Sequence, residues 1–269
     1  MEQKQFNGFK NHKNRIDMAI RDKLSTKENF LSLIKLQDEF INEYREEISL
    51  LENSESKGIQ LYSLPNTEVI QNKYETILTY EYDNLIAEYS MGENIERILP
   101  RYVNVVSLME IAWKKENGYT LLLGMISIAI MLEVDDLIFD RLVHIVKQDN
   151  LSDFLVSYLI SYRKRNLVVC TNKFYHEIPY RNVLDILNKN KINKEDAILR
   201  IKKYLTKEWY RGHSSTGWYN IHKINIYVYS GYWSFESGAL VKILGLDDSI
   251  LKGQPYYPYD MVHWADGQK

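Results

Sequence analysis

The chain has 269 residues, a formal net charge of −2 and a hydrophobic share of 45%, the composition of a globular protein that can bury a sizeable core. A charge so near zero gives no general attraction to phosphate, so the sequence predicts neither direct nucleic-acid binding nor membrane binding. Only 5 Pro and 12 Gly interrupt the chain, which favours an all-α protein over a turn-rich β fold.

Cysteine usage and the apolar stretches bear on location. Cys170 is the single cysteine and can form no intramolecular disulfide, and no secretory signal pattern opens the chain, so we expect a cytoplasmic protein. The longest apolar stretch, residues 119–132, is shorter than the roughly 20 residues that cross a bilayer. This stretch is therefore predicted to be a buried core helix.

Apolar residues recur every three or four positions through 30–51 and 69–89, as in amphipathic helices. Asn66 or Thr67 is the expected N-cap of the second helix. Further helices are predicted at 93–115, 119–132, 136–147 and 151–163, with Gly118 separating the first two and Asn150 or Ser152 capping the last.

The C-terminal part continues this pattern. Helices are predicted near 181–188, from an Asn193 cap to Trp209, and at 232–244 up to Gly245. Residues 221–229 fit a helix poorly and read as an irregular loop or a short strand. The sequence thus predicts a compact all-α bundle of about ten helices in two adjoining parts, residues 1–118 and residues 119–269, the second with an aromatic-rich tail.

Residue types that carry chemistry form no strong motif. His213 and His222 lie across a glycine-containing loop without the spacing of a zinc site, and Ser214 and Cys170 lack a nucleophile signature. No glycine-rich phosphate loop occurs. The sequence predicts no catalytic residue, no cofactor and no metal, and favours a protein that acts by binding another protein.

Acidic residues are concentrated in the first part, where residues 1–120 contain 15 Lys and Arg against 20 Asp and Glu. Such runs are usually solvated helix faces, but they also attract basic partners, and nucleases are typical basic partners because they hold phosphate. The candidate partner-binding residues are Glu39, Glu43, Glu46, Glu47, Glu81, Asp83, Glu88, Glu93 and Glu96.

The C-terminal segment contains the ordered motifs Gly231-Tyr232-Trp233-Ser234-Phe235-Glu236, Leu246-Asp247-Asp248 and Tyr256-Tyr257-Pro258-Tyr259-Asp260. This combination of a Trp-x-x-Glu step, an Asp-Asp pair and a Tyr-Pro-x-Asp ending resembles the C-terminal domain of the PoNi family of bacterial immunity proteins. Upstream, Tyr89-Ser90-Met91-Gly92 is similar to the short motif of that family's N-terminal helical domain.

The resemblance implies an all-helical immunity protein that binds the nuclease domain of a cognate PoNe toxin, a DNA-cleaving effector used in interbacterial competition. Our hypothesis is inhibition by occlusion, with the acidic helices facing the toxin. Trp233 and Glu236 are expected on one helical face, and the motif residues are assigned a structural role. They are Trp233, Glu236, Asp247, Asp248, Tyr257, Pro258 and Asp260.

Two other classes of function stay open. One is a helical enzyme with a loop site near His213 and His222, and the other is a scaffold protein that self-associates through its aromatic-rich C-terminus. A monomer and a homodimer are both compatible with the sequence.

Overall fold

The computed structural model describes residues 19–166, 171–223 and 227–268. Over these ranges the chain is helical without any strand or sheet, so the predicted all-α class is confirmed. No helix within the same ranges is both long and apolar enough to cross a bilayer. Cys170 and residues 224–226 of the irregular segment lie outside the described residues, and Ile221–Lys223 form a 3-10 turn, η3.

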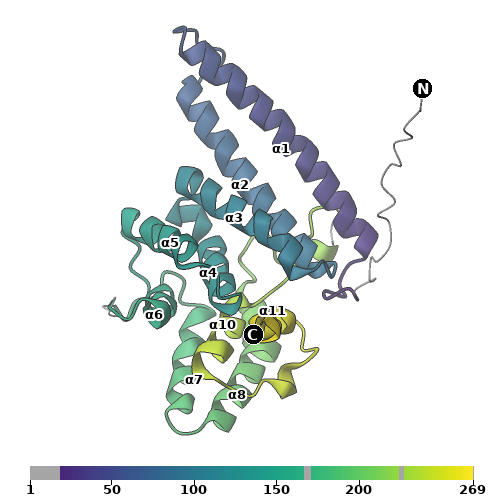
Figure 1. Cartoon of the computed structure of the whole chain (residues 1–269), viewed down its shortest axis with the longest axis vertical. Coiled ribbons are helices and arrows are strands. Elements are labelled where there is room, and N and C mark those ends of the chain that lie inside the picture. The colour runs from purple at the N-terminus through teal and green to yellow at the C-terminus, as the bar shows by residue number, and fades with distance from the viewer. Residues whose placement is uncertain (1–18, 167–170, 224–226, 269) are drawn as a thin grey trace, which may run out of the picture.

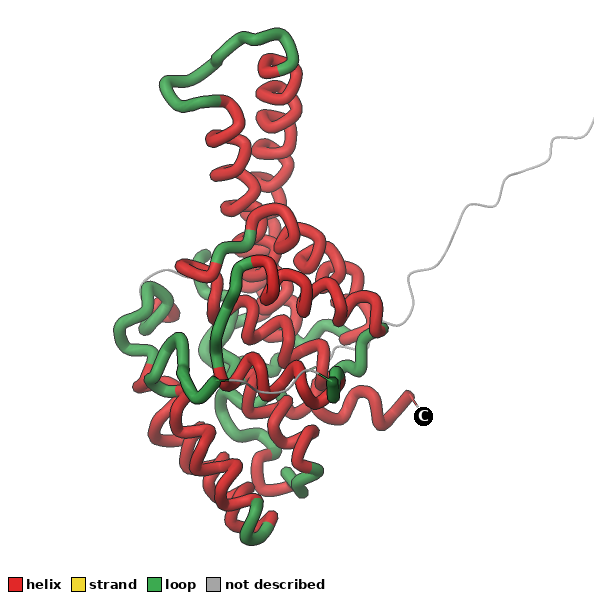
Figure 2. Tube along the Cα trace, turned by 90° about the vertical axis from the view of Figure 1, so that its left-hand side faces the viewer, coloured by secondary structure: helices red, strands yellow, loops and turns green. Residues whose placement is uncertain are grey.

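Two long antiparallel helices, α1 (Lys27–Glu55) and α2 (Asn66–Ser90), form a hairpin that projects from the rest of the molecule (Figures 1 and 2). The 29 residues of α1 span about 43 Å at the rise of an α-helix. The apolar stripe predicted for α1 is buried at Phe30, Leu33, Ile41 and Ile48. The hairpin therefore has its own apolar seam and an opposite, solvent-facing side.

The loop that joins α1 to α2 differs from the prediction. Asn66 is already helical and Pro65 occupies the cap position without a side-chain cap. The buried Asn66 amide instead accepts a hydrogen bond from the Leu61 N–H (3.1 Å) and donates to the Ile59 carbonyl (2.7 Å). Asn66 or Thr67 was expected to cap the helix, but Asn66 is its first residue and its side chain fixes the loop.

The helices α3 (Ile95–Ala112), α4 (Lys115–Met131), α5 (Asp136–Gln148) and α6 (Phe154–Arg163) follow. Asp153 caps α6, so the expected caps Asn150 and Ser152 were wrong. Residues 122–131 are buried without exception, and α5, α6 and two C-terminal helices pack on α4. The apolar stretch is therefore the central core helix, as predicted.

Gly118 does not separate two helices, because α4 begins three residues earlier. The break falls at the extended Trp113, whose indole N–H donates to the Gly118 carbonyl at 2.8 Å and whose ring covers that glycine. The expected boundary between residues 118 and 119 thus lies within the first turn of α4, and the division into two parts stays a prediction.

The C-terminal part begins with η1 (Tyr180–Asn182), α7 (Val183–Asn190) and α8 (Lys194–Lys203), and Asn193 caps α8 as predicted. The helix continues through a π-helical turn, η2 (Tyr204–Trp209), into α9 (Tyr210–Gly212). The α7 and α8 pair lies at the end of the molecule opposite the hairpin (Figure 1).

The last helices close the core. The helix α10 (Phe235–Leu244) packs on α4 and ends at Gly245, whose φ of 59° is left-handed. It starts at Phe235 and not at the expected Tyr232, so Trp233 precedes the helix and does not share a helical face with Glu236. The chain then forms η4 (Ser249–Leu251), α11 (Tyr259–Trp264) and η5 (Ala265–Gln268).

Candidate partner-binding surface

The outer side of α1 carries three of the predicted acidic residues. Glu39, Glu43 and Glu46 are all exposed, and their spacing of four and three residues places them on one helical face. The exposed Lys35 ammonium lies 4.0 Å from the Glu39 carboxylate, and Arg45, between Glu43 and Glu46 in the sequence, pairs with Glu81 at 3.3 Å. These three charges are therefore available to a partner.

Glu47 lies beside this face and is used differently. Its carboxylate forms an ion pair with Lys73 of α2, and the Lys73 ammonium also lies 4.7 Å from the centre of the Tyr44 ring. The pair joins the two helices of the hairpin, so Glu47 is directed across the hairpin and not outward.

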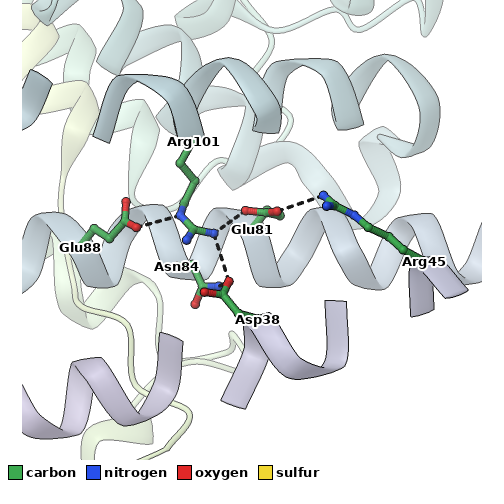
Figure 3. Close-up of polar contacts among 6 residues, drawn as sticks. All are labelled: Asp38, Arg45, Glu81, Asn84, Glu88 and Arg101. Carbon is green, nitrogen blue, oxygen red and sulfur yellow. Dashed lines mark hydrogen bonds and ion pairs between the residues drawn. The ribbon is translucent and has the colours of Figure 1, made fainter. Parts of the chain in front are cut away.

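Two of the three candidate acidic residues of α2, Glu81 and Glu88, lie around a cation from α3 (Figure 3). Arg101 lies 2.5 Å from the Glu81 carboxylate, 2.9 Å from that of Glu88 and 3.4 Å from that of Asp38 on α1. Arg45 adds a second cation 3.3 Å from Glu81, and the Asn84 amide donates to Asp38 at 2.9 Å. One ion-pair network thus spans α1, α2 and α3.

Burial controls the protonation of this network. Burial alone would lower the pKa of the Arg101 guanidinium, but Glu88, Glu81 and Asp38 together raise it above its ordinary range. Burial also raises the pKa of Glu88, although Arg101 opposes the shift. Glu81 is only 6% exposed, and both Glu81 and Glu88 form ion pairs with Arg101. These two carboxylates therefore join the hairpin to α3 and are directed toward the interior of the protein.

The remaining acidic candidates are dispersed. Asp83 points toward the C-terminal part, where the Ser230 hydroxyl donates to it at 3.3 Å, and burial raises its pKa to about 6. Glu93 forms an ion pair with Arg97 at 3.4 Å, and the exposed Glu96 lies in the first turn of α3. The nine candidates therefore do not form one surface, and the outward α1 face holds only three of them.

The two motifs that suggested a family meet in the structure. The Trp233 indole N–H donates to the Ser90 hydroxyl at 2.9 Å, and its ring meets the Tyr89 ring edge-on at 4.9 Å between centroids. Gly231, with a φ of 131°, passes so close to Ser90 that an added Cβ would lie 2.0 Å from the Ser90 hydroxyl. The end of α2 is thereby locked onto the segment that leads into α10.

Arg21 and Asp22, which precede α1 in the chain, complete this junction. Arg21 donates to the carbonyls of Tyr89 (3.0 Å) and Glu93 (2.8 Å) and lies 2.6 Å from the Asp260 carboxylate. The Asp22 carboxylate accepts hydrogen bonds from the Tyr229 hydroxyl (2.5 Å) and the Tyr232 N–H (3.1 Å). The N-terminal and C-terminal ends of the described chain are thus joined at the base of the hairpin.

The other motif residues lie inside the C-terminal part. The buried Asp248 accepts from the Tyr257 hydroxyl at 2.6 Å and lies 2.9 Å from His263, and the Asp247 carboxylate accepts from the Ser249 N–H. Pro258 is buried at the start of α11. Glu236 is buried in α10, where the hydroxyls of Tyr204 (3.0 Å) and Ser234 (2.7 Å) donate to it.

The two histidines of the glycine-containing loop, His213 and His222, both have hydrogen-bond partners. His213 is 3% exposed, and its ring nitrogens lie 3.0 Å from the Tyr180 hydroxyl and 2.7 Å from the Trp209 carbonyl. Burial lowers the pKa of His213 to about 4, so its ring is neutral near pH 7. His222 is engaged with the Tyr232 hydroxyl at 3.1 Å, and the described residues contain no cluster of three metal-ligating side chains.

Sequence reasoning missed the basic residues that organise this surface. Arg101 gave one signal, since it is the second basic residue, after Arg97, that follows the acidic run 81–96. Nothing in the local sequence distinguishes Arg21 and Asp22 as junction residues, because the contacts that place them there, with Tyr89 and Tyr229, span 68 and 207 residues.

Two family descriptions and a solved structure match this chain. The family description "PoNe immunity protein (PoNi), N-terminal" matches residues 21–144, and "PoNe immunity proteins (PoNi), C-terminal" matches residues 151–261. The crystal structure of protein PA2201 from Pseudomonas aeruginosa is similar with a TM-score of 0.60 and 18% sequence identity, over 94% of this chain and 93% of that chain. That similarity is one of fold, and no curated protein matches.

Replacing Arg101 by methionine should lower the free energy of unfolding by about 2–4 kcal/mol at pH 7.5, because Glu81 and Glu88 lose their buried cation. The loss should shrink as the pH is lowered to 5, because burial raises the pKa of Glu88 and its carboxylate therefore takes up a proton more readily. Urea denaturation measures both values. The control is Arg97→Met, whose exposed pair with Glu93 should cost no more than about 0.5 kcal/mol, and equal losses in the two variants would contradict this role.

Glu236 should make stability pH-dependent, because burial raises the pKa of its carboxyl to about 7. Ionisation is then less favourable in the folded chain than in the unfolded one, so stability is lost as the pH rises through about 7. Glu236→Gln keeps an acceptor for Tyr204 and Ser234 and should gain about 1–3 kcal/mol relative to the original chain between pH 5 and pH 8.5. A difference independent of pH, or the same gain in the exposed Glu195→Gln, would refute it.

Proposed function

The chain belongs to the PoNi family of immunity proteins against PoNe toxins, and from this premise we propose that it neutralises a PoNe-type nuclease by covering the DNA-binding surface of the toxin. As an immunity protein it binds a toxin protein. The proposal adds where and how: the outer face of α1, with Glu39, Glu43 and Glu46, docks on the cognate nuclease domain in the cytoplasm, where the DNA substrate lies. Inhibition is by occlusion, without turnover.

Charge supports this choice of face. A nuclease domain must hold phosphates with Lys and Arg, so its substrate surface is basic. Glu39 and Glu46 are seven residues apart, about 10 Å along the helix axis, so the α1 face offers several negative charges in a row. The carboxylates of Glu81 and Glu88 are paired with Arg101, whereas those of Glu43 and Glu46 are exposed to solvent. Complementary fields of this kind speed association and disfavour wrong partners.

Shape supports it as well. The loop end of the hairpin of α1 and α2 stands clear of the other helices (Figure 2), so it can approach a concave surface that the rest of the molecule cannot enter. Its base is fixed by the Arg101 network and by the junction at Ser90. A projecting element that is already ordered loses little conformational entropy when it binds.

Two alternatives have less support. An enzyme with a loop site needs free histidine nitrogens, but both nitrogens of the buried His213 lie within hydrogen-bond distance of Tyr180 and Trp209. A scaffold that associates through the C-terminal aromatics needs those rings exposed. Trp209, Tyr232 and Tyr257 are buried, and Tyr210 stacks on Tyr256 at 5.3 Å between centroids.

Reversing the charge of the α1 face with Glu39→Lys, Glu43→Lys and Glu46→Lys should slow association with the inactivated nuclease domain of the cognate PoNe toxin by about 10-fold or more at low salt. The effect should weaken as salt is added, because exposed charges are screened. Stopped-flow association kinetics at two salt concentrations measure both effects.

The matched control carries the same change in net charge elsewhere. Glu177→Lys, Glu195→Lys and Asp266→Lys also reverse three exposed acidic residues, and they should leave the association rate within about twofold. Equal slowing by the two triple variants would show that total charge matters and that the α1 face is not the docking site.

A further inference from the structure

The tip of the hairpin exposes a cluster of large apolar side chains. Ile59, Leu61, Tyr62 and Leu64 of the loop between α1 and α2 are 51%, 42%, 48% and 45% exposed. Leu50, in the last turns of α1, is 56% exposed. These five residues, here called the apolar tip, lie at the end of the molecule farthest from α7 and α8 (Figure 1). Contiguous exposed apolar residues rimmed by polar ones mark sites of protein association.

The loop that carries the apolar tip is ordered by polar contacts and not by a core of its own. Gly58 adopts a φ of 68° after α1, and the Ile59 N–H donates to the Ser54 carbonyl at 2.9 Å. The buried Asn66 amide bridges Leu61 and Ile59, and the Gln60 amide donates to the Tyr62 carbonyl at 2.9 Å. Backbone contacts thus fix the loop while its apolar side chains stay in water.

The apolar tip continues the acidic face of α1. Leu50 follows Glu46 by four residues and Glu39 by eleven, so these three side chains lie on the same side of the helix. Glu52 and Glu55 are also exposed beside the tip, with Lys57 as the one cation between Glu55 and Ile59. An apolar centre with a charged border is the usual arrangement of a protein interface.

We infer that the apolar tip is the anchor that inserts into an apolar pocket beside the basic DNA-binding surface of the toxin's nuclease domain. This inference rests on the proposed function and deepens it: the acidic α1 face sets the rate of association, and the apolar tip sets the lifetime of the complex. A few buried anchors carry most of the energy of an interface, and changes at them act mainly on dissociation.

Charge distinguishes this partner from a second copy of the chain. A symmetric dimer through the tip would bring Glu46, Glu52 and Glu55 of one hairpin against the same residues of the other. Like charges at that contact oppose association, whereas a basic nuclease domain complements them.

The test replaces Leu61, Tyr62 and Leu64 by serine in the full chain and measures binding to the inactivated nuclease domain of the cognate PoNe toxin by surface plasmon resonance. Dissociation should become at least about 100-fold faster, with an association rate within about threefold of the original. The matched control is Ile192→Ser with Leu199→Ser, which removes exposed apolar residues (72% and 57%) from the turn after α7 and from α8 and should change neither rate. Circular dichroism should show unchanged helix content in both variants.

The outcomes separate the inference from its premise. An original chain that does not bind the nuclease domain defeats the proposed function and the inference with it. Binding by the original chain with unchanged dissociation in the tip variant overturns the inference alone. A dimer of the original chain in analytical ultracentrifugation that becomes a monomer in the tip variant, with toxin binding intact, would assign the tip to self-association and also overturn it.

Discussion

Arg101 is shared by both helices of the projecting hairpin, and the placement of the acidic surface depends on it. Its guanidinium holds Asp38 of α1 and Glu81 and Glu88 of α2 from a position on α3. Because partly buried carboxylates need a paired cation, this contact fixes how the hairpin leaves the body. Around it lie two sets of acidic residues: an inner set, Asp38, Glu81 and Glu88, that is paired with arginine, and an outer set on α1, Glu39, Glu43 and Glu46, that is exposed to solvent.

The second constraint is the junction at the base of the hairpin, which gives a physical reason for the two sequence motifs of the family. Ser90 receives the Trp233 indole N–H through its hydroxyl and the backbone N–H groups of Arg21 and Asp22 through its carbonyl. Gly231 has no side chain where one would strike Ser90. Tyr89, Ser90, Gly231 and Trp233 thus meet where the hairpin joins the C-terminal part, whereas the proposed binding surface lies on the outer face of α1.

Apolar periodicity was sufficient to predict most of the helices, and the unbroken apolar stretch 119–132 was sufficient to predict the burial of α4, because both patterns can be read from consecutive residues. It could not separate Glu43 from Glu81. Both lie in acidic runs, and the burial of Glu81 depends on Arg101, which is 20 residues away on another helix. The same limit explains the errors at Asn66 and Gly118, where a loop carbonyl and the Trp113 ring override ordinary capping preferences. The exposure of the apolar residues among 59–64 could not be predicted, because a loop has no helical periodicity that would assign its side chains to a buried or an exposed side.

The most direct test of the account is co-expression of this chain with the active nuclease domain of its cognate PoNe toxin in bacteria, followed by purification through a tag on the toxin. The account predicts that the cells survive, that their chromosomal DNA stays intact and that the two proteins purify as one complex. Death and DNA degradation despite abundant folded protein would contradict it, and so would survival without any complex, since neutralisation by occlusion requires the toxin to be held.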